Sequence, residues 1–246
     1  VNALDISGGV YSPAVNSMTT TAAGVTITGG EYNAGSGAQN LLGSVLLSGG
    51  TFTGGSGGVV VTGTLTLTSG TFTAPSSTLS LVDFTHTGAT FNNNSGLVAF
   101  PSTSDHAISP NGTIFNDLFI ADFLNDGVNI TATFAAGSTM QVNGTFYVGG
   151  LDANDQMIFA NGGAAATINM NSGATLSSTP SFMSIENNTI VDLDTGNGAF
   201  ATPVNPTNST DVGGNTGWFT TTHTIAGTVY TDEGVTSIGA GTTVRV

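Results

Sequence analysis

VLLSGGTF, at residues 45–52, is one copy of the eight-residue pattern that decides the fold. The pattern runs aliphatic, any, aliphatic, any, Gly or Ser, Gly, any, aromatic. It recurs as LDISGGVY (4–11), VTITGGEY (25–32), LTLTSGTF (65–72) and, less exactly, FTHTGATF (84–91). The aromatic residues fall at positions 11, 32, 52, 72 and 91. A fixed period near twenty residues is typical of proteins built from stacked repeats.

Each repeat contains a second pair of residues, seven and nine positions after the aromatic. The pairs are Met18/Thr20, Gln39/Leu41, Val59/Val61, Leu79/Leu81 and Val98/Phe100. They are mostly apolar and two residues apart, which is the spacing of a β-strand with one buried face. One repeat therefore holds three short strands: the aliphatic pair, the aromatic piece and this later pair.

The small residues between the first two strands predict a corner. Leu65 and Leu67 share a strand face, but Phe72 lies an odd number of residues from Leu67. Ser69 and Gly70 must therefore turn the chain to bring Phe72 inward, and glycine accepts the positive φ that such a turn needs. The sequence predicts an all-β fold, a single-stranded, right-handed parallel β-helix (β-solenoid) with about 20 residues and three short strands per coil.

Stacking of these coils predicts two buried columns of side chains. Their members are Val25, Val45, Leu65 and Phe84 in one, and Tyr32, Phe52, Phe72 and Phe91 in the other. Each coil alone cannot bury its apolar face, so the core forms between successive coils.

The regularity of the pattern divides the chain into three parts. Residues 1–100 are regular coils, and residues 101–218 are expected to continue as less regular coils with a long loop near 202–217. Residues 219–246 read as the start of a further β module or coil. The sequence begins inside a coil and ends on TTVRV, so we expect a processed product or a fragment of a longer chain. The alternative is a complete protein with open ends, whose strand edges would pair end to end with another copy.

Composition excludes several classes of partner. The 246 residues carry 15 acidic and one basic side chain, Arg245, for a net charge of −14, and there is no cysteine. Phosphate neutralisation requires several Lys or Arg side chains, so we expect no nucleic-acid partner. No apolar run approaches the length of a transmembrane helix, so no membrane span is expected. The sequence contains N-x-Thr sequons such as those that begin at Asn111, Asn129 and Asn143.

Several stretches carry a resemblance to known proteins. They are GTLTLTSGTFT (63–73), TGATFNNNSGLVAF (87–100), GTIFNDLFI (112–120) and GGNTGWFTT (213–221). Together they resemble large bacterial surface and secreted β-helix repeat proteins, which are adhesin-like. The resemblance implies an extracellular or cell-surface location and a structural role, and it implies no chemistry.

Catalytic residues are hard to find in this chain. A polysaccharide lyase needs a basic side chain, and only Arg245 is present, at the terminus. An inverting hydrolase needs two carboxylates across a cleft, and Asp192 and Asp194 are the closest pair in sequence. We interpret that pair as solvated acids on the outer face of one strand. We therefore expect no enzyme and no catalytic residue.

Calcium is the metal that suits this composition, because Asp, Asn and backbone oxygens suffice as ligands. The candidate ligands are Asp192 and Asp194 in DLDTGNG (192–198), and Asp152 and Asp155 in LDANDQ (151–156). Neither stretch completes a known calcium loop, so no cofactor other than a structural calcium ion is expected.

The histidines favour structural roles. His86 takes a core position and is expected to be satisfied by neighbouring backbone. His106 lies in a polar stretch and is expected to be solvated, and His223 has no obvious partner.

Three functions remain open from the sequence. The first is a structural stalk, fibre or adhesin segment that joins end to end into a filament. The second is a carbohydrate-binding or carbohydrate-cleaving β-helix, favoured by clustered acids beside exposed aromatic residues. The third is an ice-binding solenoid, because Thr-x-Thr recurs, although Leu46 and Ser48 interrupt one threonine column.

Overall fold

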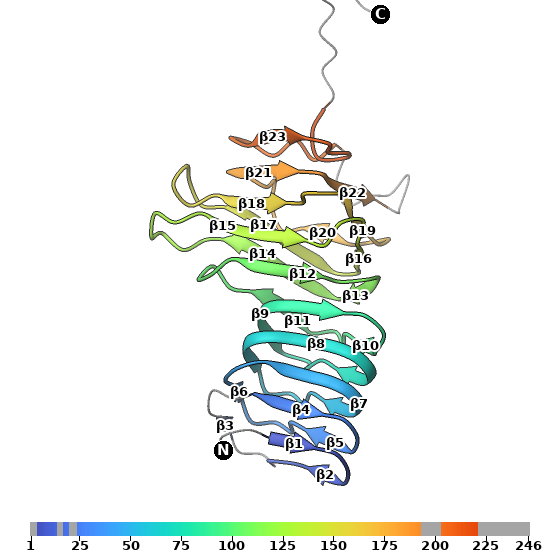
Figure 1. Cartoon of the computed structure of the whole chain (residues 1–246). Coiled ribbons are helices and arrows are strands. Elements are labelled where there is room, and N and C mark those ends of the chain that lie inside the picture. The colour runs from blue at the N-terminus through green and yellow to red at the C-terminus, as the bar shows by residue number, and fades with distance from the viewer. Residues whose placement is uncertain (1–3, 14–16, 20–23, 193–202, 221–246) are drawn as a thin grey trace, which may run out of the picture.

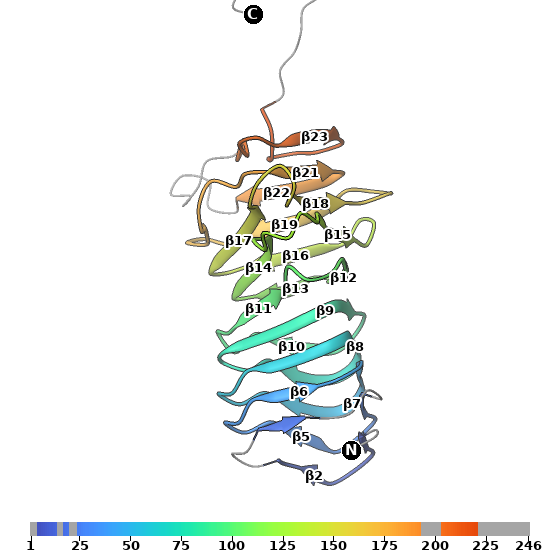
Figure 2. The same ribbon diagram turned by 90° about the vertical axis from the view of Figure 1, so that its left-hand side faces the viewer.

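The computed structural model describes residues 4–13, 17–19, 24–192 and 203–220. These residues form strands and connecting loops with no helix, and the paired strands run parallel. Figures 1 and 2 show the strands stacked along one axis, with the earliest strands at one end and β23 at the other. The fold is all-β and consistent with a β-solenoid. Among the described residues, no helix is long and apolar enough to cross a membrane.

The strands pair in three series, and three long strands contribute to more than one series. These long strands are β7 (Val45–Thr53), β8 (Val59–Thr73) and β9 (Thr78–His86). The first series contains the aliphatic pairs. Apart from the long strands, its members are β1 (Leu4–Ile6), β4 (Val25–Ile27), β12 (His106–Ser109), β15 (Ile130–Phe134), β18 (Met157–Ala160), β21 (Met183–Glu186) and β23 (Thr210–Gly213).

The second series contains the aromatic pieces. Its early members, besides β7 and β8, are β2 (Val10–Tyr11), β5 (Glu31–Asn33) and β10 (Thr90–Asn92). A separate four-stranded sheet follows, made of β13 (Thr113–Phe115), β16 (Thr139–Val142), β19 (Ala166–Met170) and β22 (Asn188–Asp192).

The third series contains the later pairs. Besides β8 and β9, its members are β3 (Met18–Thr19), β6 (Gln39–Leu41), β11 (Leu97–Phe100), β14 (Asp117–Asp122), β17 (Thr145–Gly150) and β20 (Thr175–Leu176). Gln39, the polar residue predicted to face inward here, is fully buried and accepts a hydrogen bond from the Tyr32 hydroxyl at 2.8 Å.

The predicted columns are confirmed by the strand register. Val25 pairs with Val45, Val45 with Leu65, and Leu65 with Phe84. Tyr32, Phe52 and Phe72 pair in the same way, and their rings stack with centroids 4.9 and 4.5 Å apart. This ring spacing matches the distance between neighbouring strands, so the register sets the aromatic stack.

The predicted corner is also confirmed. Gly30, Gly50 and Gly70 have backbone φ angles of 68°, 66° and 87°, values that residues with a side chain rarely adopt. A Cβ atom at Gly50 would lie 2.3 Å from the carbonyl oxygen of Gly30 in the preceding repeat. Glycine is needed here both for the turn and for the close stacking of successive corners.

The spacing of about 20 residues applies only to the first part of the chain. Phe84 pairs with Ile108, Ile108 with Phe134, and Phe159 with Ile185, so the paired residue lies 24 to 26 positions further on. The added residues lie partly in loops between the third and first series, at 123–129 and 151–156. These loops extend from the side of the stack beside β15 and β18 (Figure 1).

The segment expected to be a long loop, 202–217, differs from the expectation. Its described residues include β23, which pairs with β21, and Thr207 forms a parallel bridge with Ser181. Trp218 is buried and its ring meets that of Phe159 edge to face at 5.9 Å. Most of the proposed further module, at 221–246, lies outside the described residues.

Candidate functional site

Two acidic residues are buried where the loops at 123–129 and 151–156 stack. Asp155 is 1% exposed, and its Oδ1 accepts hydrogen bonds from the backbone N–H groups of Gly127 at 2.7 Å and Asp126 at 3.1 Å. The carboxylate of one loop therefore caps the backbone of the loop in the preceding repeat. This contact holds the two loops together and holds the Asp155 side chain in place.

Asp122 is the second buried acid, and sequence reasoning missed it. It ends β14, where it follows the inward-facing Leu118 and Ile120 at strand spacing, so its carboxyl group points into the stack. Asp122 is 0% exposed, and neither of its carboxyl oxygens makes a hydrogen bond of standard geometry. The available signal was an acidic residue at an inward position of an alternating strand.

Burial raises the pKa of the Asp122 carboxyl above its usual value, because the charged form loses its hydration. The backbone N–H groups of Leu124 and Ile130 oppose this shift in pKa, whereas Asp155 and Asp126 add to it by repulsion. The Ile130 N–H already donates to the carbonyl oxygen of Gln156 at 3.1 Å, which explains why it cannot fully satisfy Asp122. The two buried acids thus repel each other, and no described residue is an Arg or Lys that could neutralise them.

Of the four calcium candidates from the sequence, the structure describes the side chains of two, Asp152 and Asp155, and these two make different contacts. Asp152 accepts a hydrogen bond from the N–H of Asn154 at 2.7 Å, within its own turn, while Asp155 contacts the preceding loop. Asp192 ends β22, but its side chain lies outside the described part of the chain, as does Asp194. Within the described residues, no three His, Cys, Asp or Glu side chains form a group that could hold a metal ion by themselves.

An exposed aromatic cluster lies next to this site. Phe119 on β14 has its ring centroid 5.8 Å from that of Phe123 and 6.3 Å from that of Tyr147 on β17. Phe123 is 46% exposed and Tyr147 is 37% exposed. The adjoining loops add the exposed side chains of Leu124 and Leu151. Exposed apolar groups gathered in this way are typical of binding surfaces.

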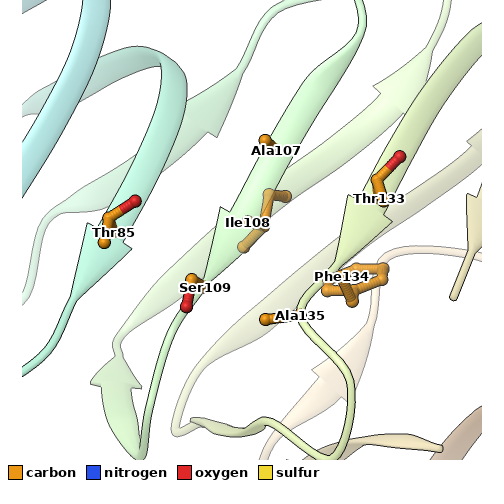
Figure 3. Close-up of a pocket in the computed structure, with 7 residues that line it drawn as sticks. All are labelled: Thr85, Ala107, Ile108, Ser109, Thr133, Phe134 and Ala135. Atoms are coloured by element: carbon orange, nitrogen blue, oxygen red, sulfur yellow. The ribbon is translucent and has the colours of Figure 1, made fainter. Parts of the chain in front are cut away.

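A small pocket of about 200 Å³ lies on the first series of strands. Its lining residues come from β9, β12 and β15 and the residue after β15 (Figure 3); they are Thr85, Ala107, Ile108, Ser109, Thr133, Phe134 and Ala135. None of these side chains titrates near neutral pH, and none is a metal ligand of the kind that Asp, Glu, His or Cys supplies. The lining therefore offers shape and three hydroxyl groups, without an acid, a base or an activated nucleophile.

The predictions for the histidines agree with the structure at one position and disagree at another. The prediction for His86 is confirmed: it is buried, with Nδ1 2.8 Å from the Thr113 hydroxyl oxygen and Nε2 2.7 Å from the carbonyl oxygen of Ala89. The prediction for His106 is wrong. His106 is 3% exposed, and its ring nitrogens lie 2.6 and 3.1 Å from the carbonyl oxygens of Val82 and Pro101. His223 lies outside the described residues.

The threonine columns are short and interrupted. Leu46 pairs with both Thr26 and Thr66, as the sequence indicated. In the neighbouring column Thr51 pairs with Thr71, but Glu31 precedes them. A continuous flat array of hydroxyl groups is therefore not formed by these columns.

The chain matches no family model, no curated protein and no solved structure.

Proposed function

We propose that this chain is a segment of a single-stranded, right-handed parallel β-helix that serves as an extracellular structural element: a stalk, fibre or adhesin segment. In this proposal residues 1–100 have about 20 residues and three short strands per coil, and the later coils are longer. The observation that carries it is the parallel pairing of the first series, which runs from β1 to β23 with each strand paired to the next. Right-handedness follows the usual crossover of parallel strands.

The stacking of the repeats and the charge of the surface support this role. Each repeat contacts its neighbours along its whole length, so length can be extended without a larger core. The side chains between repeats are buried, whereas outward positions such as Thr28, Thr68 and Asp105 are exposed and polar. The acidic charge of −14 disfavours side-by-side association at low salt, which favours thin rods over sheets.

End-to-end association is part of the same proposal. Among the described strands, β1, β2 and β3 are each paired along one edge only. Unpaired strand edges serve as templates for another strand, from further coils of a longer chain or from another copy.

Negative-stain electron microscopy of the purified chain tests this proposal directly. We expect narrow rods, and filaments if the ends join. Compact particles without an elongated shape would contradict it. We further propose that the chain is not an enzyme, because Arg245 is the one Arg or Lys side chain in the sequence and the lining of the pocket on the first series carries no acid or base.

A carbohydrate-binding role is the second candidate, and the exposed cluster of Phe119, Phe123 and Tyr147 favours it. Aromatic rings offer large, rigid contact area at low entropic cost, which suits the apolar faces of sugar rings. The ice-binding alternative has weaker support, because the threonine columns are interrupted.

Binding to a panel of neutral and acidic polysaccharides tests the second candidate. If the cluster binds sugar, Phe123→Ala and Tyr147→Ala should each weaken binding by about tenfold, or ~1.4 kcal/mol. Ile114→Ala is the matched control, because Ile114 is equally exposed but lies on β13 in another series. Equal losses in all three variants, or no binding by the unmodified protein, would remove this candidate.

A further inference from the structure

We propose that Asp122 and Asp155 form one calcium-binding site between the loops at 123–129 and 151–156. Two buried carboxylates would supply the charge, and backbone carbonyl oxygens and water would complete the oxygen shell. The site lies where a long loop of one repeat stacks on the long loop of the next.

The first step of the argument is the state of Asp122. Both of its carboxyl oxygens are buried without a hydrogen bond of standard geometry. A buried carboxylate that has no neutralising charge beside it, only the weak contacts of the Leu124 and Ile130 N–H groups, is costly in a protein interior. The only basic side chain in the sequence is Arg245, which lies outside the described residues, so a bound cation is the simplest source of compensating charge.

The second step is the placement of Asp155. Its carboxylate is anchored by two N–H groups of the loop that follows Asp122, and it lies close enough to repel Asp122. Two like charges held together in a buried place require a shared proton or a shared cation. Asp155 Oδ1 already accepts both anchoring N–H groups, which fixes the carboxylate in position, and a cation bound between the two acids would compensate both charges at once.

The third step is a set of carbonyl oxygens on the same side of the sheet. Asp122 pairs in register with Gly150, and paired residues on neighbouring strands point to the same face. A Cβ atom at Gly150 would lie 2.4 Å from the carbonyl oxygen of Phe182 and 2.6 Å from that of Asp155. The absence of a Gly150 side chain lets these two carbonyl oxygens approach the strand next to Asp122. Each accepts one backbone hydrogen bond, from the N–H of Met157 and of Leu151, and keeps a second lone pair for a cation.

The identity of the ion follows from the ligands. Two carboxylates balance a divalent ion, and the donors are all oxygen, which suits calcium or magnesium rather than zinc or copper. Calcium accepts irregular shells of six to eight oxygens, whereas magnesium needs a near-ideal octahedron. Irregular loops with two carboxylates and carbonyl groups therefore favour calcium, in the affinity range of extracellular modules, about 0.1–1 mM.

Calcium-dependent melting and direct titration test the proposal. The protein is freed of metal with a chelator and studied in about 0.15 M NaCl, which screens weak attraction of calcium to the acidic surface. Calorimetric titration should show one calcium ion per chain. Calcium at about a hundred times its dissociation constant should raise the melting temperature by about 5–10 °C. Magnesium should bind at least about tenfold more weakly.

Single substitutions distinguish calcium binding at this site from nonspecific attraction of calcium to the acidic surface. Asp122→Asn and Asp155→Asn should each lower the calcium affinity by at least about tenfold, the effect of losing one carboxylate ligand. Asp105→Asn is the matched control, because Asp105 is exposed and its Oδ1 likewise accepts a backbone N–H, from Thr131 at 2.8 Å. Its calcium affinity should not change.

Three results would overturn the proposal. The first is no stoichiometric binding by the unmodified protein at about 10 mM calcium, a concentration ten times the largest dissociation constant expected. The others are wild-type calcium affinity in Asp122→Asn, and an affinity of the unmodified protein for magnesium equal to that for calcium. If Asp122→Asn does not fold, the titration of the unmodified protein and of Asp155→Asn decides the question.

Discussion

The aromatic column shows at the residue scale how one side chain supports its neighbours in the stack. Phe72 is 1% exposed and lies between Phe52 and Phe91, whose rings are 4.5 and 5.7 Å away. Beyond Phe91 the next ring, Phe115, is turned edge-on, at 69°. The parallel stack therefore ends in the region where the repeats become longer.

Phe72→Ala should lower the free energy of unfolding by about 3–5 kcal/mol, because it opens a cavity in this column. Thr66→Ala, on the outward side of the same strand β8, should cost far less. Urea unfolding followed by circular dichroism measures both. Equal losses would show that the assignment of inward and outward positions is wrong.

Tyr32 predicts a pH dependence at the residue scale. Burial raises the pKa of its hydroxyl far above the usual value, and Tyr11 adds a smaller effect in the same direction. Above about pH 10 the unfolded chain loses this proton while the folded chain keeps it. Because the folded state then binds more protons, stability should fall as pH rises beyond about 10.

Tyr32→Phe should flatten this alkaline loss of stability. At about pH 8 the variant should be less stable by about 1–3 kcal/mol, because the buried Oε1 of Gln39 loses the hydroxyl that donates to it. Tyr147→Phe, at an exposed position, is the control and should keep the wild-type pH dependence. An unchanged alkaline slope in Tyr32→Phe would assign the effect to another group.

Corners dominate at the element scale, because successive repeats approach each other most closely there. Gly8 and Gly49 occupy the same position of the repeat, but their surroundings differ. A Cβ atom at Gly49 would lie 2.3 Å from the carbonyl oxygen of Thr28 in the preceding repeat, whereas a Cβ atom at Gly8 meets nothing within 4 Å.

Gly49→Ala should therefore destabilise the protein by about 1–3 kcal/mol, the usual cost of overpacking. Gly8→Ala should be neutral or slightly stabilising, because it only restricts the unfolded chain. Thermal or urea unfolding of the two variants compares them. A similar result for both would argue against close stacking of the third repeat on the second.

Length and charge set the behaviour of the whole molecule. Parallel pairing of successive strands links β1 to β23 through the first series. At the other end of this stack, β1, β2 and β3 are each paired along one edge only among the described strands. If the chain joins end to end, sedimentation should show species that grow with protein concentration, because such a contact does not close on itself. A single compact monomer at all concentrations would remove the filament from the proposed function.

A test of catalysis also belongs to the whole molecule. We expect no reducing or unsaturated sugar to be released from acidic or neutral polysaccharides. Measured turnover that disappears in Asp192→Asn or Asp194→Asn would contradict the structural role.

The sequence by itself determined the three strand series of the first hundred residues. Alternating apolar residues and glycine corners are local properties, and the period of the aromatic residues set which residue pairs with which, as with Phe52 and Phe72. The sequence alone did not predict that Asp122 and Asp155, 33 positions apart, lie close together, or that His106 is buried. Only the tertiary structure decided these contacts, because they depend on how loops of unequal length in successive repeats stack, and loop length breaks the period from which pairing can be predicted.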